Sequence, residues 1–180
     1  MSERLIWMDL EMTGLDPARD AIVEIAMVVT EMNDYAALAE CEFVIHQSED
    51  VLSGSPEVVR DMHERSGLYT RVRASKMDLA QAEGDLLDVL GKHCRVREGI
   101  LAGNSIWQDR RFLAAYLPAF EHYLHYRQVD VTTLKLLART WFGEAGRFDK
   151  PGKTHTALAD VHASIEELKF YRRLFGVPNT

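Results

Sequence analysis

Two acidic residues near the N-terminus have the spacing of a paired catalytic site. Asp9 and Glu11 lie at the end of an apolar run over residues 5–10, before a turn cluster at residues 13–17. Side chains two apart on a β-strand point to the same face, so we expect the two carboxylates side by side, with their roots about 6.5–7 Å apart. A solvated strand end would also explain an Asp-x-Glu pair. The flanking apolar residues instead indicate a central strand with both faces covered.

Two further acids occupy the apolar faces of predicted helices. Asp109 lies at the head of the core-facing stripe of a helix predicted over residues 108–117, and Asp160 lies in the stripe of a helix predicted over residues 155–175. An acid at a helix start also serves as a partner for the helix dipole. However, a carboxylate between buried side chains is costly unless it has a partner. His155 stands five residues before Asp160, and we expect both to face one cleft.

A cleft that gathers Asp9, Glu11, Asp109 and Asp160 requires a counter-charge. Two like charges 4 Å apart repel by roughly 1 kcal/mol in bulk water and by about 4 kcal/mol at an effective dielectric constant of 20. Divalent cations remove this repulsion, and all-oxygen ligands select Mg²⁺ or Mn²⁺ over Zn²⁺. Two such ions hold the attacking and leaving oxygens of an in-line displacement at phosphorus, while a neutral imidazole such as His155 accepts a proton. The set therefore indicates a phosphodiesterase site with two divalent cations.

Apolar periodicity predicts the elements that position these residues. Strands are predicted over residues 5–10, 22–30, 39–45, 100–102 and 128–131, and helices over residues 56–66, 78–94, 108–117, 134–142 and 155–175, with a Gly-rich loop at residues 143–154. Short connections favour an antiparallel meander for the first three strands. The alternation of helix and strand that follows predicts an α/β fold, with a mixed sheet of three antiparallel strands plus parallel strands, flanked by helices.

Composition limits the classes of protein to consider. The chain has 180 residues, of which 47% are hydrophobic and 27% charged, which predicts one soluble domain over residues 1–180. The longest apolar runs fall short of the ~18–20 residues of a membrane span. Residues 1–4 lead directly into a predicted strand, so we expect no cleaved secretion signal. Cys41 and Cys94 are distant in sequence, which argues against a disulfide framework or a zinc ribbon and favours the cytoplasm. A formal charge of −7 argues against non-specific coating of long nucleic acid, but a local basic pocket or a bound cation still allows a short anionic substrate.

Three motifs in chain order contain the acids and the histidine. They read DLEMTGLD at residues 9–16, GNSIWQDRRF at residues 103–112 and HTALAD at residues 155–160. Together they resemble the motifs of the DEDD-type 3′-to-5′ exonucleases, histidine subtype. The segment HYR at residues 125–127, followed by DVTTLK at residues 130–135, extends the resemblance to the oligoribonuclease family over nearly the whole chain. The resemblance implies an RNase H-like fold, a homodimer, and removal of nucleotides from the 3′ end of very short RNAs, down to dinucleotides.

The resemblance also implies roles for individual residues. Asp9, Glu11, Asp109 and Asp160 would hold two divalent metal ions, Mg²⁺ or Mn²⁺. His155 would be the general base that deprotonates the attacking water.

Tyr126 would be a second catalytic residue and would reach the active site from the partner subunit, although an aromatic residue there could also serve only the interface. Other positions would bind the substrate. Leu15 would wedge against the bases. The 5′ phosphate would be bound by Ser105, Arg127, Thr132 and His63; a guanidinium also matches phosphate oxygens in a bidentate way. Family members often carry Trp near position 58, where Val58 offers little stacking area.

Three functions remain open at this point. The first is an exonuclease that degrades very short oligoribonucleotides to 5′-mononucleotides. The second is a proofreading or trimming 3′-to-5′ exonuclease on longer DNA or RNA, against which stand the acidic charge and the lack of a long basic or aromatic strip. The third is a non-catalytic nucleotide-binding module, which predicts the loss of an acid or of the histidine, whereas all five residues are present.

Overall fold

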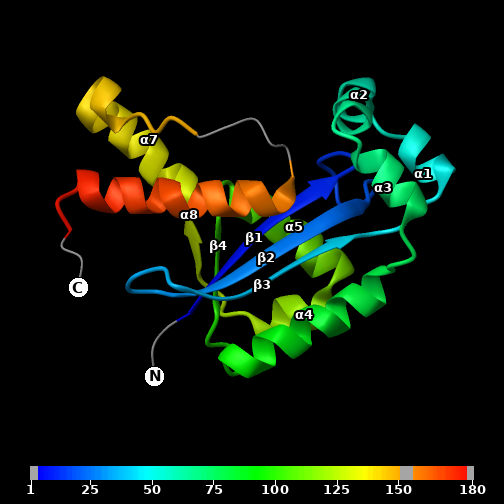
Figure 1. Ribbon diagram of the computed structural model, residues 1–180, viewed down its shortest axis with the longest axis horizontal. Helices are drawn as coiled ribbons and strands as arrows, with labels where there is room; N and C mark the ends of the chain where they lie inside the picture. Colours follow the sequence, from blue (N-terminus) through cyan, green and yellow to red (C-terminus); the bar gives the residue numbers. More distant parts are fainter. Residues whose placement is uncertain (1–3, 151–155, 178–180) are drawn as a thin grey trace.

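The described residues form a five-stranded mixed sheet. The computed structural model describes residues 4–150 and 156–177. Over these residues the strand order is β3-β2-β1-β4-β5 (Figure 1), with β1 (Arg4–Met12), β2 (Ile22–Glu31), β3 (Ala37–Val44), β4 (Ile100–Gly103) and β5 (Gln128–Asp130). The first three strands are antiparallel, whereas β4 is parallel to both β1 and β5. The predicted α/β class and mixed sheet are confirmed.

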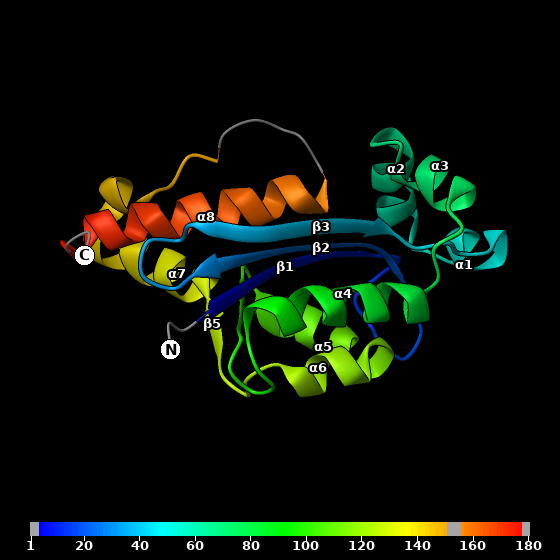
Figure 2. The ribbon, with the colours of Figure 1, turned by 60° about the horizontal axis from the view of Figure 1, so that its bottom comes forward.

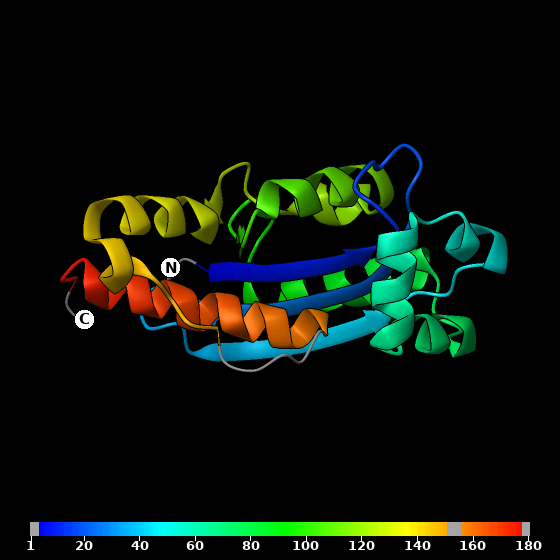
Figure 3. The same cartoon turned by 90° about the horizontal axis from the view of Figure 1, so that it is seen from above.

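Helices cover both faces of the sheet. They are α1 (Glu49–Ser53), α2 (Glu57–Arg65), α3 (Leu68–Ala74), α4 (Leu79–His93), α5 (Ile106–Tyr116), α6 (Pro118–Tyr123), α7 (Val131–Phe142), the 3₁₀ helix η1 (Gly143–Gly146) and α8 (Ala157–Leu174). Figure 2 shows α7 and α8 on one face and α4, α5 and α6 on the other. Helices α1 to α3 lie beyond the end of β1 (Figure 3). In the part of the chain that the structure describes, every helix is too short or too polar to cross a bilayer.

The central strand β1 is buried on both faces. Ile6, Met8 and Leu10 belong to the core beneath α4, α5 and α6, whereas Leu5 and Trp7 belong to the core beneath α7 and α8. This alternation follows from the two-residue repeat of a strand. Because the acids continue the second series, they emerge on the α8 face at the C-terminal end of β1.

The short strand β4 leaves part of β1 without a neighbour. Parallel pairing between the two strands runs from Leu5 opposite Ile100 to Trp7 opposite Ala102. Beyond Trp7, the edge of β1 on that side is open, and α5 begins three residues after β4 ends. The first turn of α5 therefore reaches the open edge of β1.

Several helices differ from the prediction. Helices α1, α3 and α6 were not predicted, because such short helices depend on tertiary contacts more than on periodicity. In α3, for example, Leu68, Tyr69 and Val72 are buried against Val23 of β2. Pro118, expected only to end a helix, begins α6, because proline is well suited to the first helical position. Helices α5 and α7 begin two and three residues earlier than predicted, and η1 lies in the predicted loop.

Candidate active site

Carboxylates from β1 and α8 form a cluster. One oxygen atom from each of Asp9, Glu11 and Asp160 lies within 4.8 Å of the other two. The first two side chains stand on the face of the sheet that α8 covers, and Asp160 lies in the first turn of α8. The structure thus brings together three acids from distant parts of the sequence. We call these three residues the carboxylate cluster.

The start of α8 is held by local hydrogen bonds. Thr156 is the N-cap, and its hydroxyl accepts a hydrogen bond from the N–H of Ala159 at 3.3 Å. The Ser164 hydroxyl donates to the backbone carbonyl of Asp160 at 2.9 Å. The predicted general base, His155, precedes this N-cap in the sequence and lies outside the described residues.

Asp109 approaches the open edge of β1 from the first turn of α5. Its Oδ1 accepts a hydrogen bond from the backbone N–H of Leu10 at 2.9 Å, and its side chain is buried. This contact is available because the edge of β1 has no neighbour beyond Trp7. Asp109 is not one of the three residues of the carboxylate cluster, but it is fastened to the backbone between Asp9 and Glu11.

Burial and neighbouring negative charges raise the pKa of the two acids on β1. Burial, and then the charges of Asp109, Glu11 and Asp160, hold the pKa of Asp9 well above its usual range. Burial and the charges of Glu24 and Asp160 raise the pKa of Glu11 to about 7. The effect on Asp9 indicates that Asp109 acts electrostatically with the carboxylate cluster.

Burial also raises the pKa of Asp109 to about 7, although the hydrogen bond from Leu10 opposes the shift. Groups with perturbed pKa values at a common site are typical of catalytic or metal-binding centres. The cluster offers only carboxylate oxygens, the donors that hard divalent cations prefer. The side chains present therefore fit a divalent cation.

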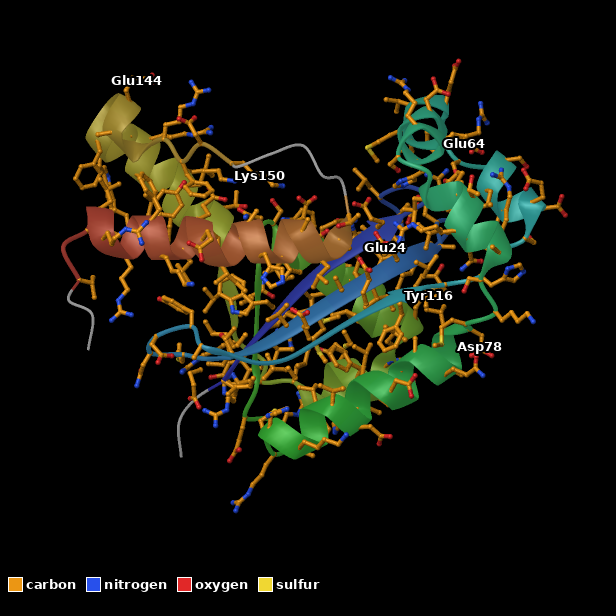
Figure 4. The ribbon with its side chains drawn as sticks, viewed as in Figure 1. Glu24, Glu64, Asp78, Tyr116, Glu144 and Lys150 are labelled. Atoms are coloured by element: carbon orange, nitrogen blue, oxygen red, sulfur yellow. The ribbon has the colours of Figure 1, made fainter. Side chains whose placement is uncertain are left out.

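Lys150, which no motif predicted, also reaches this site. The Lys150 ammonium is ion-paired with Oδ1 of Asp160. Its positive charge lowers the pKa of both Asp9 and Glu11, in opposition to the larger effects of burial and like charge. Figure 4 shows Lys150 on the segment that approaches α8. The predicted loop over residues 143–154 has no periodicity that could have indicated this contact.

Ser105 and Thr132 are in contact. The N–H of Ser105 donates to Thr132 Oγ1 at 2.8 Å and to Asp130 Oδ1 at 3.0 Å. Ser105 has φ of 51°, in the left-handed region that non-glycine residues seldom adopt. Backbone strain of this kind concentrates at functional sites.

Tyr126 and Arg127 lie at the other end of β5 from this pair. The N–H of His125 donates to the carbonyl of Gly99 at 2.8 Å, which places the segment beside the start of β4. The Tyr126 side chain is 68% exposed, and its ring stacks on His125 with the centroids 4.5 Å apart. By strand register, Tyr126 is about five residues, or roughly 16 Å along the strand direction, from Asp9 of the same chain.

Arg110 also holds this segment in place. The Arg110 guanidinium donates to the carbonyls of His125 and Tyr126 at 3.0 Å each and to that of Arg127 at 3.4 Å. The same group is ion-paired with Glu121 at 2.8 Å. Arg110 follows Asp109 in the second motif, but the motif alone did not predict these contacts.

His63 lies beside the carboxylate cluster in a buried position. Its ring Nε2 donates to the carbonyl of Met12 at 3.0 Å and lies 4.0 Å from Oε2 of Glu11. Burial lowers the pKa of His63, so the neutral ring is favoured. Its predicted part in phosphate binding stays a prediction. Val58, on the same helix, is exposed.

Leu15 projects from the loop after β1. Its side chain is 71% exposed, whereas its carbonyl accepts a hydrogen bond from Gln108 Nε2 at 2.7 Å. Asp20 closes the loop by accepting from the N–H of Asp16 at 2.9 Å. A Cβ atom at Gly14 would lie 2.4 Å from the Asp20 carboxylate, so a larger residue would displace that carboxylate. The loop presents an apolar side chain on a fixed support.

Comparison with known sequences gives close relatives. A family model described as "Exonuclease" matches residues 6–168. The chain is 49% identical over 173 residues to an oligoribonuclease of Azoarcus sp. (strain BH72), which covers 95% of this chain and 94% of that one. It is 46% identical over 181 residues to an oligoribonuclease of Mycobacterium ulcerans (strain Agy99), which covers 99% of this chain and 84% of that one.

Solved structures give the fold. The chain aligns with E. coli exonuclease I in complex with a 5cy-dT13 oligonucleotide, with a TM-score of 0.71 and 16% identity over 98% of this chain. It also aligns with the zinc-bound form of an E. coli exonuclease I–ssDNA complex, with a TM-score of 0.69 and 15% identity over 98% of this chain. The chain spans 43% and 42% of the lengths of those two structures. At this identity the likeness establishes an RNase H-like fold.

Proposed function

The chain belongs to the oligoribonuclease family of exonucleases, and from this premise we propose that it hydrolyses very short oligoribonucleotides, including dinucleotides, from the 3′ end to 5′-mononucleotides. The observation that carries the proposal is the carboxylate cluster, with Asp109 fastened to the backbone beside it. Such a cluster can hold divalent cations, which stabilise the charge that develops at a reacting phosphodiester.

The proposed cofactors are two divalent cations, Mg²⁺ or Mn²⁺. Asp9, Glu11, Asp109 and Asp160 would hold them. When bound, the cations would stabilise charge on the reacting phosphate and lower the pKa of a water molecule. The electrostatics support this proposal, because burial and like charge disfavour ionised carboxylates at this position.

The proposed general base is His155. A neutral imidazole has a pKa suited to taking a proton near pH 7. Its place in the sequence supports this role, because it comes just before the helix that carries Asp160. Lys150, which is paired with Asp160, would limit the negative charge at the site before a phosphate arrives.

Short substrates are proposed because the recognition groups are few and local. The exposed Leu15 would pack against a base. Ser105 and Thr132, which are in contact, would bind the 5′ phosphate together with His63. Arg127 lies at the other end of β5 from this pair, so a second copy of the chain would supply it. With a formal charge of −7, the protein would rely on such local contacts for affinity rather than on a long basic groove.

We also propose that the active protein is a homodimer. Tyr126 lies roughly 16 Å along the strand direction from Asp9 of its own chain, farther than a tyrosine side chain reaches. A second copy would supply Tyr126 to the site, and the exposure of this ring leaves it available for such a contact.

Both cysteines are free thiols, in keeping with a cytoplasmic protein.

The test is hydrolysis of a 5′-phosphorylated diribonucleotide in EDTA, Mg²⁺ or Mn²⁺. We expect 5′-mononucleotides only with a divalent cation, and loss of activity in Asp9→Asn. Asp88→Asn, which removes an exposed charge on α4, is the matched control and should keep the wild-type rate. Product formation in EDTA, or full activity of Asp9→Asn, would contradict the proposal.

A length series distinguishes the other hypotheses. RNAs of two to twenty nucleotides, each labelled at the 5′ end, should be cleaved fastest at the short end of the series. Equal or faster cleavage of 20-mers would favour a trimming exonuclease. Binding of the dinucleotide without turnover in either cation would favour a nucleotide-binding module.

A further inference from the structure

A fifth carboxylate lies behind the carboxylate cluster and belongs to no part of the proposed reaction. Glu24, on β2, is fully buried and is the cross-strand neighbour of Glu11. Its side chain faces α8, as those of Asp9 and Glu11 do. Figure 4 shows Glu24 between the start of α8 and the helices beyond the end of the sheet.

The two oxygens of Glu24 make different contacts, a hydrogen bond at Oε2 and an ion pair without a hydrogen bond at Oε1. Oε2 accepts a hydrogen bond from the backbone N–H of Ala157 at 3.1 Å, and Oε1 is ion-paired with Nη2 of Arg71 at 2.7 Å. Ala157 is the first residue of α8, where backbone N–H groups have no partner within the helix. Burying a carboxylate costs much desolvation free energy, and partners such as these offset that cost. The arrangement joins β2, α3 and α8 through one side chain.

This connection bears directly on Asp160. Ala157 and Asp160 are three residues apart, so about 4.5 Å of helix separates them along the axis. A displacement of the first turn of α8 would move Asp160 away from Asp9 and Glu11. Ligand distances at a metal site tolerate deviations of only about 0.2 Å, so even a small displacement would weaken the binding of a cation.

We propose that Glu24 and Arg71 are positioning residues that hold the first turn of α8, and thus Asp160, where the carboxylate cluster can share a divalent cation. The inference rests on the proposed metal dependence, but not on the identity of the substrate. Neither residue contacts the reacting atoms. Their effect is on the affinity of the site for the cation.

The experiment measures binding of Mn²⁺ alone to the full chain, by electron paramagnetic resonance, and exchange of the Ala157 amide hydrogen in EDTA. Glu24→Ala should weaken Mn²⁺ binding roughly 10- to 100-fold, the usual effect of removing a residue that orients a ligand. It should also speed exchange at Ala157. Glu24→Gln keeps an acceptor for that N–H but loses the ion pair, so its Mn²⁺ binding should lie between those of Glu24→Ala and the wild type.

Variants on α3 provide the matched comparison. Arg71→Ala should weaken Mn²⁺ binding and Arg71→Lys should restore most of it. Arg73 lies on the exposed side of α3 and is ion-paired with Glu49 and Glu64. Arg73→Ala removes these two ion pairs and should bind Mn²⁺ like the wild type. In dinucleotide hydrolysis, Glu24→Gln should need a higher Mn²⁺ concentration than the wild type to reach its half-maximal rate. At saturating Mn²⁺, its kcat and its KM for the dinucleotide should stay near the wild-type values.

Three results would overturn the inference. One is Mn²⁺ affinity within twofold of wild type in Glu24→Gln and Arg71→Ala, with unchanged exchange at Ala157. Another is an equal loss in Arg73→Ala, which would indicate general destabilisation of α3. A third is a wild-type protein that binds no Mn²⁺. If the variants lose Mn²⁺ affinity as expected but the wild type does not cleave dinucleotides, the inference stands and only the proposed substrate is wrong.

Discussion

The Asp109 carboxylate accepts a hydrogen bond from the backbone N–H of Leu10 at 2.9 Å, across 99 residues of sequence. This bond forms because β4 pairs with β1 only as far as Trp7, so that the Leu10 amide faces the first turn of α5. Asp109 thereby has both a structural contact with Leu10 and a charge close to Asp9. Substitutions can separate the effect of the hydrogen bond from the effect of the charge.

Asp109→Asn should fold and lose activity. The amide oxygen still accepts from Leu10, and removal of a buried acid whose pKa is raised to about 7 relieves unfavourable charge at pH 8. Loss of a charged ligand should lower kcat by roughly 10²–10³. Urea unfolding in EDTA at pH 8 should show a midpoint no lower than that of the wild type. Asp109→Ala also removes the acceptor, so its midpoint should be lower than that of Asp109→Asn; equal midpoints would show that the hydrogen bond contributes no stability.

The metal-free protein should become less stable as the pH rises from about 4.5 to 7. In this range the folded protein keeps protons on Glu11 and Asp109, whose pKa values are about 7, while the unfolded chain has released them. Stability falls with pH wherever the folded state binds more protons. For Glu11, the pKa shift from 4.5 to about 7 corresponds to a loss of at most about 3 kcal/mol in the free energy of unfolding.

Thermal unfolding in EDTA from pH 4.5 to 8 measures this effect. Glu11→Gln should flatten the profile, and Mn²⁺ at pH 8 should restore the lost stability of the wild type. Asp88→Asn, on the exposed side of α4, should keep the wild-type slope. Stability that increases steadily over this range would refute the assigned pKa shifts.

The sequence predicted the central part of the site because strand and helix periodicities determine which side chains share a face. The apolar series on β1 placed Asp9 and Glu11 on one face, and the buried stripe of α8 indicated that Asp160 has a partner. The structure brings these three acids together. Asp109 lies beside them instead of among them, a distinction that depends on where β4 ends.

Other contacts depend on tertiary structure that no local pattern encodes. Lys150 contacts a residue 10 positions away, and Arg110 contacts residues 15 to 17 positions away, in both cases through loops. Glu24 contacts a residue 133 positions away, across two layers of the fold. The location of Tyr126 at the far end of β5 could not be predicted from the motif that contains it. It follows from the register of three parallel strands.

Arg110→Ala should impair a site in the other subunit. Loss of its hydrogen bonds to three successive carbonyls releases the segment that carries Tyr126. Dinucleotide hydrolysis should fall about 10-fold or more, corresponding to one or more kcal/mol. Mixing Arg110→Ala with inactive Asp9→Ala should restore activity, because a mixed dimer has one site with intact acids and an intact partner segment.

Arg95→Ala, at an exposed position, is the control and should retain full activity without mixing. If the mixed sample were no more active than the sum of its components, Arg110 would act within its own subunit. The particle mass in solution, measured on each sample, establishes whether the variants still associate.

Arg127→Ala should weaken binding of a 5′-phosphorylated dinucleotide more than that of an unphosphorylated one. A hydrogen bond to a charged group contributes roughly 1.5–3 kcal/mol, so the expected change in Kd is about 10- to 100-fold for the phosphorylated ligand alone. Binding is measured on the inactive Asp9→Asn background in the presence of Mn²⁺. Arg127→Lys should recover only part of the affinity, since an ammonium lacks the bidentate geometry. Equal losses for both ligands would exclude Arg127 from the phosphate pocket.

Leu15→Ala should raise the KM for dinucleotides, because the exposed side chain has no role in the core and is free to pack against a base. Loss of about 1–2 kcal/mol of apolar contact corresponds to a roughly 5- to 30-fold increase. Gln108→Ala keeps that side chain but removes the hydrogen bond to its carbonyl, so it should raise KM less. The double variant should be no worse than Leu15→Ala, because the loop support matters only through the side chain it presents. If the two substitutions raised KM additively in the double variant, Gln108 would contact the substrate itself. Val96→Ala, which shortens another exposed apolar side chain, is the control and should leave KM unchanged.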